Sequence, residues 1–559
     1  MRSVLSWMCG CSLSAVAAGQ DVHHGYLDHM DLVGRIQSVQ VNAPDQVEVR
    51  TLGTSREGRA IFLLALANDS VSSGDRPQLL VVAGADGRHL MGTELVMRMV
   101  EELLESHSDL LDEVEILVVP RLNPDAAEAN LGPLNAGRAG TSRLVDADRD
   151  GLMDEDHPMD LDGDGVIVQM RLLDTSLKHP PTHLVDPADE RLMKSPDRAA
   201  GERPVFAVMV EGMDQDGDGL VGEDGPSDVE LDRNFMHLWP EHASHAGPYP
   251  LSESEARVMA ELVLENPRIF AAVVYGPHDT VLNMPDHRGR DTSGRVPREI
   301  HEADKPLYET LGSLYREHTA QARTTDAPND GSLHGWLYAH RGIPTVATTG
   351  WGRPDPTPPA EGEEKAKDEQ DAPKPADGEA AAWLIYADQD RGGVGFVPWH
   401  PFDHPQFGRV EIGGFVPGFR RNPPLDVIEG LAPGHAAFID ALADRRPRLI
   451  FAEPETESLG GGLYRIRWAM SNEGELPVIT RMGRDNRAIR PTAVRLDVPI
   501  EHIIEGKPVH LQRGLDGDGG RAAYEWVIRG GKEPISIKID DPIWGKRTIN
   551  VALPTGGDR

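Results

Sequence analysis

Cysteine is almost absent from this chain, which has 559 residues but only Cys9 and Cys11. Both lie in an N-terminal stretch with the pattern of a signal peptide. Arg2 carries a positive charge, residues 4–16 are mostly apolar, and residues 15–17 form a small-residue cleavage site. We therefore expect a signal peptide over residues 1–18 and a secreted or periplasmic protein. After cleavage no cysteine remains, which excludes disulfides and thiolate metal sites.

Positive charge and long apolar runs are also scarce. The 56 lysines and arginines face 91 aspartates and glutamates, and the resulting net charge of −35 argues against nucleic acid or an anionic membrane surface as a partner. No later run approaches the roughly 18 consecutive apolar residues that a membrane span needs. Hydrophobic residues nevertheless make up 39% of the chain, which is enough for sizeable cores. The length predicts two to about four domains.

The first half of the chain alternates apolar runs with a helical pattern. Residues 60–67, 79–83 and 114–119 are largely apolar, as expected for buried strands. Between the last two, residues 93–106 place apolar side chains at helical spacing. Strand–helix–strand alternation predicts an α/β fold with a mixed, largely parallel sheet flanked by helices. Binding sites in such sheets form beyond the carboxyl ends of the strands.

Four segments resemble the zinc carboxypeptidase family (carboxypeptidase A/B-like) and occur in the family's order. They read LLVVAGADGRH at 79–89, PRLNPD at 120–125, ELDRNF at 230–235 and GIPTVATTGW at 342–351. The resemblance extends over residues 49–440 and is to a secreted bacterial type of the family. It implies the family's fold, a catalytic zinc ion and hydrolysis at the C-terminus of a peptide.

The family's catalytic positions are altered in this sequence. In relatives the first segment ends in H-x-x-E, which supplies two zinc ligands, and Asp86 and His89 stand in those positions. A third ligand, a histidine that closes a later strand, is replaced by Gly276, and the general-base glutamate is replaced by Thr349. The resemblance therefore implies a pocket in which these four positions converge but the catalytic residues are missing.

A rearranged zinc site is the main alternative. Asp86, His89 and the nearby His278 have side chains that can bind zinc, and a catalytic zinc needs three protein ligands and one open position for water. Pro277 stiffens the backbone before His278 and opposes such a rearrangement. Thr349 has no group that accepts a proton near neutral pH, so we assign no catalytic residue.

Substrate binding is less altered. The family binds the terminal carboxylate of a peptide through an Asn-Arg pair, and Asp232-Arg233 stand at the corresponding positions. Arg233 keeps the two-pronged guanidinium donor that suits a carboxylate. Asp232 replaces a neutral amide with a carboxylate, so the pair is equally consistent with a local ion pair between Asp232 and Arg233.

An acidic insert at residues 140–228 contains three D-x-D-x-D-G motifs. Each is the beginning of a calcium-binding loop, with oxygen ligands at alternate positions and a glycine at the sharp turn. The bidentate glutamate of a complete EF-hand is missing, because His157, Arg171 and Gly225 stand at position twelve, and flanking helices are not evident. We expect calcium in at least one loop; ordinary acidic turns are the alternative. The predicted ligands are Asp146, Asp148 and Asp150; Asp160, Asp162 and Asp164; and Asp214, Asp216 and Asp218.

The remaining chain divides into recognisable parts. We expect a carboxypeptidase-like domain over residues 19–445, with a disordered loop at residues 355–379, which are rich in proline and charge. Residues 395–405 are packed with aromatics and prolines and suggest a rigid structural loop. Short alternating strands from residue 446 to residue 559 predict a β-sandwich accessory domain.

These features favour one function over two alternatives. We predict a secreted carboxypeptidase-like protein that is catalytically inactive, contains calcium and binds a peptide or protein C-terminus in its altered pocket. The first alternative is an active metallocarboxypeptidase that uses zinc bound by Asp86, His89 and His278. The second is a structural or envelope-binding scaffold in which the C-terminal sandwich makes the contacts.

Overall fold

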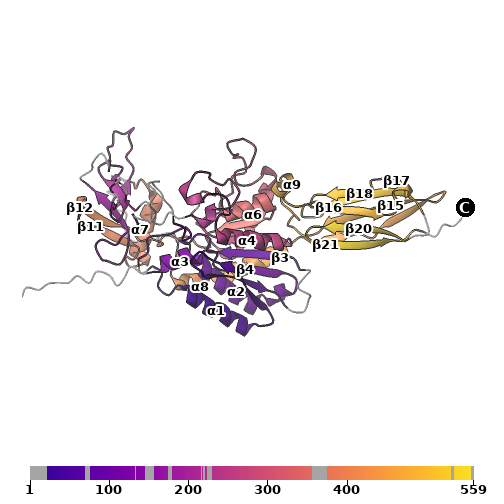
Figure 1. Cartoon of the computed structure of the whole chain (residues 1–559), viewed down its shortest axis with the longest axis horizontal. Helices are drawn as coiled ribbons and strands as arrows, with labels where there is room; N and C mark the ends of the chain where they lie inside the picture. The colour runs from indigo at the N-terminus through magenta and orange to yellow at the C-terminus, as the bar shows by residue number, and fades with distance from the viewer. Residues whose placement is uncertain are drawn as a thin grey trace, which may run out of the picture.

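The structure is a computed structural model that describes residues 22–68, 76–132, 134–144, 156–173, 179–215, 217, 219, 221–222, 229–325, 327–355, 374–530 and 534–554. The chain forms a central α/β body with a small sheet region at one end and a β-rich domain at the other (Figure 1). The predicted signal peptide lies outside the described residues. Within the described part of the chain, no helix has the length and hydrophobicity to cross a membrane.

The central sheet has six strands in the order β1-β2-β4-β3-β9-β10. Its first two pairings, β1 with β2 and β2 with β4, are antiparallel, and the other three are parallel. This confirms the mixed, largely parallel sheet. The strands are β1 (Val47–Thr54), β2 (Ala60–Leu66), β3 (Gln78–Ala83), β4 (Glu115–Val119), β9 (Ile269–Tyr275) and β10 (Thr345–Thr348).

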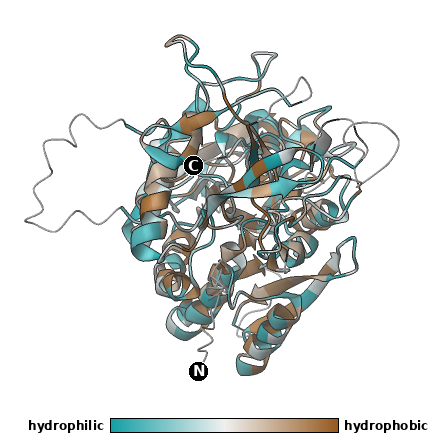
Figure 2. Cartoon of the chain, turned by 90° about the vertical axis from the view of Figure 1, so that its left-hand side faces the viewer, coloured by the Kyte–Doolittle hydropathy of each residue, from teal (hydrophilic) through white to brown (hydrophobic). Residues whose placement is uncertain are grey.

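Helices cover both faces of this sheet, and alternate residues of β3 show why. Leu79 and Val81 pack into one hydrophobic core, whereas Leu80 and Val82 pack into the other. The helices carry hydrophobic and hydrophilic residues on different sides (Figure 2). The first core is closed by α1 (His29–Asn42), α2 (Met91–Ser106), α5 (Lys305–Thr319) and α8 (Leu425–Asp444), and the second by α4 (Ser254–Glu265) and α6 (Leu333–Arg341).

A second sheet joins the acidic insert to a distant segment of the chain. Its order is β11-β12-β5-β8, with β11 (Phe396–His404), β12 (Gly408–Phe415), β5 (Gln169–Leu172) and β8 (Ala207–Val210). The prediction of a structural loop at residues 395–405 is therefore wrong, because most of that segment is an edge strand. Pro398 fits there, since the register shifts between Val397 and His400 and an edge strand tolerates a missing N–H.

The acidic insert also contains a two-stranded sheet of β6 (Leu184–Asp186) and β7 (Asp189–Lys194). Of the loop predicted to be disordered at residues 355–379, residues 356–373 lie outside the described residues. The end of that prediction is wrong, because α7 (Gly378–Asp390) begins within it. The Asp377 carboxylate caps this helix by accepting from the backbone N–H groups of Glu379 and Ala380.

The C-terminal part is a sandwich of two sheets, as predicted. One contains β13 (Leu449–Phe451), β14 (Glu455–Gly460), β15 (Leu463–Asn472), β17 (Ile503–Glu505) and β19 (Gly520–Arg529); the other contains β16 (Thr492–Asp497), β18 (Val509–Gln512), β20 (Ile535–Asp541) and β21 (Gly545–Val551). Trp526, Ile466 and Ile537 are fully buried in the core between them. The sandwich meets α6 of the central body through the short helix α9 (Arg481–Asp485), where Gly342 packs against Gly483.

Candidate functional site

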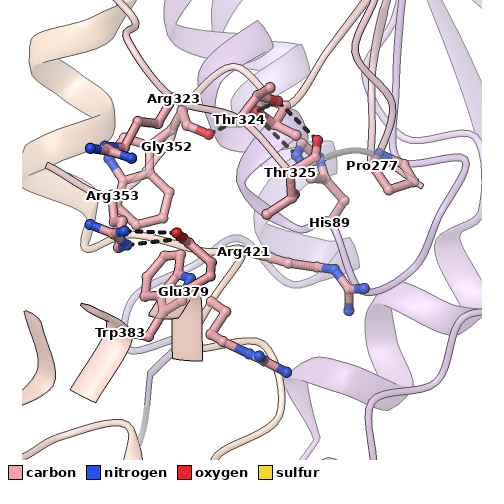
Figure 3. A pocket seen from close by; sticks show the side chains of 13 residues that line it. His89, Pro277, Arg323, Thr324, Thr325, Gly352, Arg353, Glu379, Trp383 and Arg421 are labelled. Atoms are coloured by element: carbon pink, nitrogen blue, oxygen red, sulfur yellow. Dashed lines mark hydrogen bonds and ion pairs between the residues drawn. The ribbon is translucent and has the colours of Figure 1, made fainter. Parts of the chain in front are cut away.

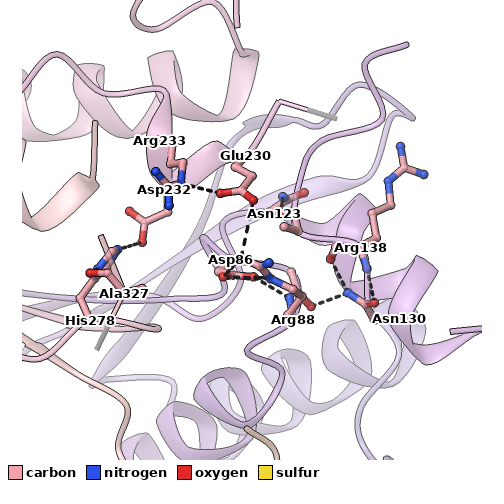
Figure 4. A network of polar contacts seen from close by, with 12 residues as sticks. Asp86, Arg88, Asn123, Asn130, Arg138, Glu230, Asp232, Arg233, His278 and Ala327 are labelled. Atoms are coloured by element: carbon pink, nitrogen blue, oxygen red, sulfur yellow. Dashed lines mark hydrogen bonds and ion pairs between the residues drawn. The ribbon is translucent and has the colours of Figure 1, made fainter. Parts of the chain in front are cut away.

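The altered catalytic positions lie at the carboxyl ends of β3, β9 and β10. Asp86 and His89 follow β3, His278 follows β9, and Thr349 follows β10. A cavity of about 280 Å³ at this edge is lined by Asp86, Arg88, Ala139, Glu230, Asp232, Arg233, Pro277, His278, Ala327 and Pro328. We call it the remnant pocket; Figure 4 shows its polar network.

Asp86 forms an ion pair with an arginine from its own turn. The Arg88 guanidinium donates to both carboxylate oxygens of Asp86, with Nε 2.9 Å from Oδ1 and Nη2 2.7 Å from Oδ2. The backbone N–H of Arg88 also donates to Oδ1 at 2.9 Å. Burial opposes ionisation of Asp86, yet Arg88 outweighs it and holds the pKa of this carboxyl well below its usual range. Asp86 is thus a carboxylate whose counter-charge the chain already supplies.

His89 is turned toward a backbone carbonyl. Its Nε2 lies 3.0 Å from the carbonyl oxygen of Thr349, and because a carbonyl only accepts, Nε2 carries the proton. The other ring nitrogen, Nδ1, has no hydrogen-bond partner among the described residues. A Cβ placed on Gly92 would lie 3.0 Å from it, so this nitrogen packs against the start of α2. Burial lowers the pKa of His89 to about 4, which keeps the ring neutral.

His278 pairs with Asp232. Its Nε2 lies 3.0 Å from Asp232 Oδ2, and its Nδ1 lies 3.2 Å from the carbonyl oxygen of Ala327. Both contacts are hydrogen bonds only when both nitrogens carry protons, and a ring in that state has no lone pair for a metal. The second carboxylate oxygen of Asp232 accepts from the backbone N–H of Leu333 at 2.8 Å.

The same aspartate lies beside Gly276. A Cβ placed on Gly276 would lie 3.8 Å from Asp232 Oδ2, which is ordinary van der Waals contact. The carboxylate that replaces the family's amide therefore lies where the third ligand histidine begins in relatives. Sequence reasoning placed Asp232 with the substrate instead.

Thr349 is a structural hydroxyl. Its Oγ1 donates to the carbonyl oxygen of Trp351 at 2.8 Å and accepts from Gln321 Nε2 at 3.0 Å. The Thr324 hydroxyl lies 3.1 Å away. The general-base position thus holds a buried, hydrogen-bonded hydroxyl that has no proton-accepting role near neutral pH.

Arg233 pairs with Glu230 rather than with Asp232. Its Nε donates to Glu230 Oε2 at 2.7 Å, three residues back in the same short turn. Arg88 Nη2 lies 3.8 Å from the other oxygen of Glu230, so this glutamate lies between the two arginines. Sequence reasoning missed both Arg88 and Glu230. The available signal was that Arg88 follows Asp86, and Glu230 precedes Arg233, at short distance along the chain and with opposite charge.

The residues present do not fit the zinc ion that the family implies. Asp86 is bound to Arg88, His89 faces Thr349, and His278 faces Asp232. Among the described residues, the one group of three or more potential ligands with mutually close atoms is Asp160, Asp162 and Asp164. The structure therefore does not bring Asp86, His89 and His278 together as a ligand set.

The second D-x-D-x-D-G motif forms a compact turn. One carboxylate oxygen from each of Asp160, Asp162 and Asp164 lies within 4.8 Å of the others. His400, on β11, lies 2.7 Å from Asp162 Oδ2. Asp214 of the third motif is buried and caps Gly217 N at 2.7 Å. The other predicted calcium ligands, Asp146, Asp148, Asp150, Asp216 and Asp218, lie outside the described residues.

Glu211, which sequence reasoning missed, connects this turn to the core. Its carboxylate accepts from the backbone N–H groups of Leu161 at 2.7 Å and Val168 at 3.1 Å. The side chain is fully buried, and burial together with Asp162 and Asp160 raises the pKa of Glu211 to about 7. An isolated glutamate gave no sequence signal for this role.

Comparison with known proteins identifies the class of the central domain. Residues 33–150 match the zinc carboxypeptidase family, and residues 448–552 match a family described as "Domain of unknown function (DUF8731)". Carboxypeptidase D of Mus musculus is 33% identical over 110 residues, which are 18% of this chain and 8% of that protein. Carboxypeptidase D of Anas platyrhynchos is 30% identical over 159 residues, 27% of this chain and 11% of that protein.

This chain therefore contains a domain of the zinc carboxypeptidase family. It spans only 8 to 11% of the carboxypeptidase D relatives. Among solved structures, thrombin activatable fibrinolysis inhibitor aligns over 75% of this chain and 76% of its own, with 12% identity and a TM-score of 0.36. Carboxypeptidase A from Helicoverpa armigera aligns over 58% and 64%, with 12% identity and a TM-score of 0.34.

Proposed function

We propose that this is an exported carboxypeptidase-like protein that does not hydrolyse peptides and instead binds the C-terminus of a peptide or protein in the remnant pocket. The observation that carries the proposal is the guanidinium of Arg88 bound to both oxygens of Asp86. A cation from the chain lies against the carboxylate that replaces the first zinc ligand.

The chemistry of the pocket supports loss of hydrolysis. A hydrolytic zinc site keeps three protein ligands and an open position for water, and the metal lowers the pKa of that water to about 7. Here Asp86 and His278 are paired with Arg88 and Asp232. Thr349 replaces the base that would remove the proton, so a bound metal would still lack its partner.

Arg233 has donors available to bind a carboxylate. Only its Nε is used by Glu230, and its two terminal nitrogens have no partner within the described residues. The side chain is partly exposed at the remnant pocket. A guanidinium with free terminal nitrogens suits the two oxygens of a C-terminal carboxylate.

Hydrolysis and binding are tested on one preparation of residues 19–559. Blocked peptides ending in Phe, Arg or Glu, with zinc added, should release no amino acid. The same peptides should bind in fluorescence anisotropy, and amidation of the C-terminus or Arg233→Gln should weaken binding. Arg290→Gln, which removes an arginine outside the remnant pocket, is the matched control. Chelator-sensitive release that His89→Ala abolishes would establish the active-enzyme alternative.

We also propose that Asp160, Asp162 and Asp164 bind calcium. Three carboxylates with close oxygens repel one another until a cation neutralises them, and alternating aspartates before a glycine are the ligand pattern of calcium loops. Calcium would hold this turn of the insert beside His400 on β11. A thermal melt with and without calcium tests this site.

A further inference from the structure

A second cavity, of about 390 Å³, adjoins the remnant pocket, and Pro277 lines both. We call it the arginine pocket. It is lined by His89, Pro277, Arg323, Thr324, Thr325, Thr349, Trp351, Gly352, Arg353, Glu379, Trp383, Arg420 and Arg421 (Figure 3). Segments that lie far apart in the sequence thus contribute four arginines and a single carboxylate to one cavity.

Two of these arginines are neutralised by partners. Arg353 donates to both carboxylate oxygens of Glu379, at 3.0 Å and 2.8 Å. Arg323 Nε donates to Asp355 at 2.6 Å. The positive charge that remains in the pocket therefore belongs to the adjacent pair Arg420 and Arg421, in a protein whose net charge is −35.

The side chains of Arg420 and Arg421 form no hydrogen bond or ion pair with any residue that the structure describes. Arg420 lies over the ring of Phe415, 4.8 Å from its centroid, which uses the face of the guanidinium and leaves its edge N–H donors available. Arg421 is half-buried, and burial lowers the pKa of its guanidinium. It extends below His89 and away from the Arg353–Glu379 pair (Figure 3).

The turn that carries the pair is fixed on both sides. Gly418 has φ +83°, and a Cβ there would lie 2.4 Å from His23 Nε2, so the turn requires glycine. Phe419 is 1% exposed. Asn422 accepts from the backbone N–H of Met91 at 3.0 Å and donates to the carbonyl oxygen of Arg88 at 3.0 Å. The two guanidinium groups are therefore presented by an anchored backbone.

We infer that the arginine pocket binds a small oxyanion, a carboxylate or phosphate group carried on an apolar body. Arg420 and Arg421 supply the donors, because guanidinium groups match the spacing of oxygens in both anions. Trp351 and Trp383, which are 8% and 2% exposed, supply the apolar wall. Arg420 is exposed and Arg421 is half-buried without a hydrogen-bond partner among the described residues, so part of the burial cost that opposes an ion pair at Arg421 is already present. The inference is independent of peptide binding at Arg233.

Isothermal titration calorimetry of the intact chain at constant ionic strength tests this site. The probes are inorganic phosphate, phenyl phosphate, benzoate and the neutral control benzamide. We expect at least one anion to bind and benzamide not to bind. Arg421→Gln and Arg420→Gln should each weaken anion binding about tenfold, which corresponds to about 1.4 kcal/mol. Arg409→Gln, which removes one exposed charge from β12, should leave the affinity unchanged.

Each outcome bears on the inference. Tighter binding of phenyl phosphate than of benzoate assigns a phosphate ligand, and the reverse order assigns a carboxylate; either supports the oxyanion site. Arg421→Lys keeps the charge but loses the two parallel N–H donors of the guanidinium, so this variant should bind the anion with intermediate affinity. Circular dichroism verifies that each variant is folded. No anion binding at millimolar concentration, or equal affinity in Arg421→Gln and Arg409→Gln, would overturn the inference, whatever the peptide assays show.

Discussion

The remnant pocket and the Asp160–Asp164 turn differ in the partners that the chain supplies to their carboxylates. In the remnant pocket each buried carboxylate has a partner from the chain: Asp86 has Arg88, and Asp232 has His278. In the turn, three carboxylates come together, and among the described contacts His400 is the one ionisable partner. The first cluster has its counter-charges from the chain, whereas the second is the site that we propose for calcium.

Under the proposed function, the difference shows how a metal site can be lost without unfolding the domain. A buried carboxylate without a counter-charge is costly. Here Asp86 is paired with the cation of Arg88, and Asp232 lies beside Gly276. We therefore expect the remnant pocket to depend on its own arginine and the turn to depend on calcium.

The largest expected effect follows from Arg88→Ala. This variant leaves Asp86 buried without its partner and should lower the free energy of unfolding by about 3 kcal/mol at pH 7. The pKa of Asp86 is depressed in the folded state, so the contribution is present above about pH 4, where the unfolded carboxyl ionises, and is lost as the pH falls further. Urea denaturation at pH 7 and pH 3 measures both values.

Arg50→Ala is the matched control for that prediction. Arg50 also donates to a carboxylate two residues away, with Nε 2.7 Å from Glu48 Oε1. The side chains of Arg50 and Glu48 are, however, 47% and 62% exposed. Its loss should cost less than about 1 kcal/mol. Equal costs for the two arginines would contradict the assignment of Arg88 as a replacement cation.

Calcium should give the next largest effect. At a hundredfold excess over its dissociation constant, calcium should stabilise the protein by about 2.7 kcal/mol, which a thermal melt detects as a higher Tm. Magnesium should do less, because it requires tighter octahedral geometry. The double variant Asp160→Asn/Asp162→Asn should lose the shift, whereas Asp516→Asn/Asp518→Asn in the sandwich should keep it. A full shift in the first variant would move calcium to the other two motifs.

A smaller effect concerns Glu211. Its pKa is raised to about 7 in the folded state, so its protonated form favours folding, and this stability is present below about pH 4 and lost as the pH rises through 7. Calcium-free protein should therefore lose on the order of 1 kcal/mol between pH 5 and pH 8 that Glu211→Gln does not lose. Urea midpoints measure the difference. Parallel pH profiles for the two proteins would show that Glu211 does not titrate in this range.

No effect is expected from Thr349→Glu on peptide hydrolysis. Restoring the base alone leaves a free water, whose pKa stays at about 15.7 without a metal. Release of C-terminal amino acids should remain at the background rate in a chromatographic assay. Activity in this variant would show that a metal-bound water was already present.

Local patterns predicted much of the fold. The apolar runs at β3 and β4 and the helical spacing of α2 each lie within one continuous segment. The central sheet could therefore be predicted from the sequence. The sandwich followed from its alternating strands. Strand β11 was missed because its prolines resemble a loop, and its pairing with β12 at a sheet edge is what accommodates them.

The site was less predictable because its partners are set by tertiary structure. The sequence located the altered positions and the residues that stand there, but not the partners that these residues contact. Asp232 and His278 are 46 positions apart, and nothing in either segment indicates that they meet. The arginine pocket draws its four arginines from three separate segments, so a single motif could not reveal it.

The metal content of the untagged protein tests the central claim most directly. After incubation with equimolar zinc and calcium followed by dialysis, elemental analysis should find calcium but no stoichiometric zinc, because Arg88 already occupies Asp86 and His278 faces Asp232. One zinc per chain that Asp86→Ala and His89→Ala both remove would contradict the account and restore a metallocarboxypeptidase.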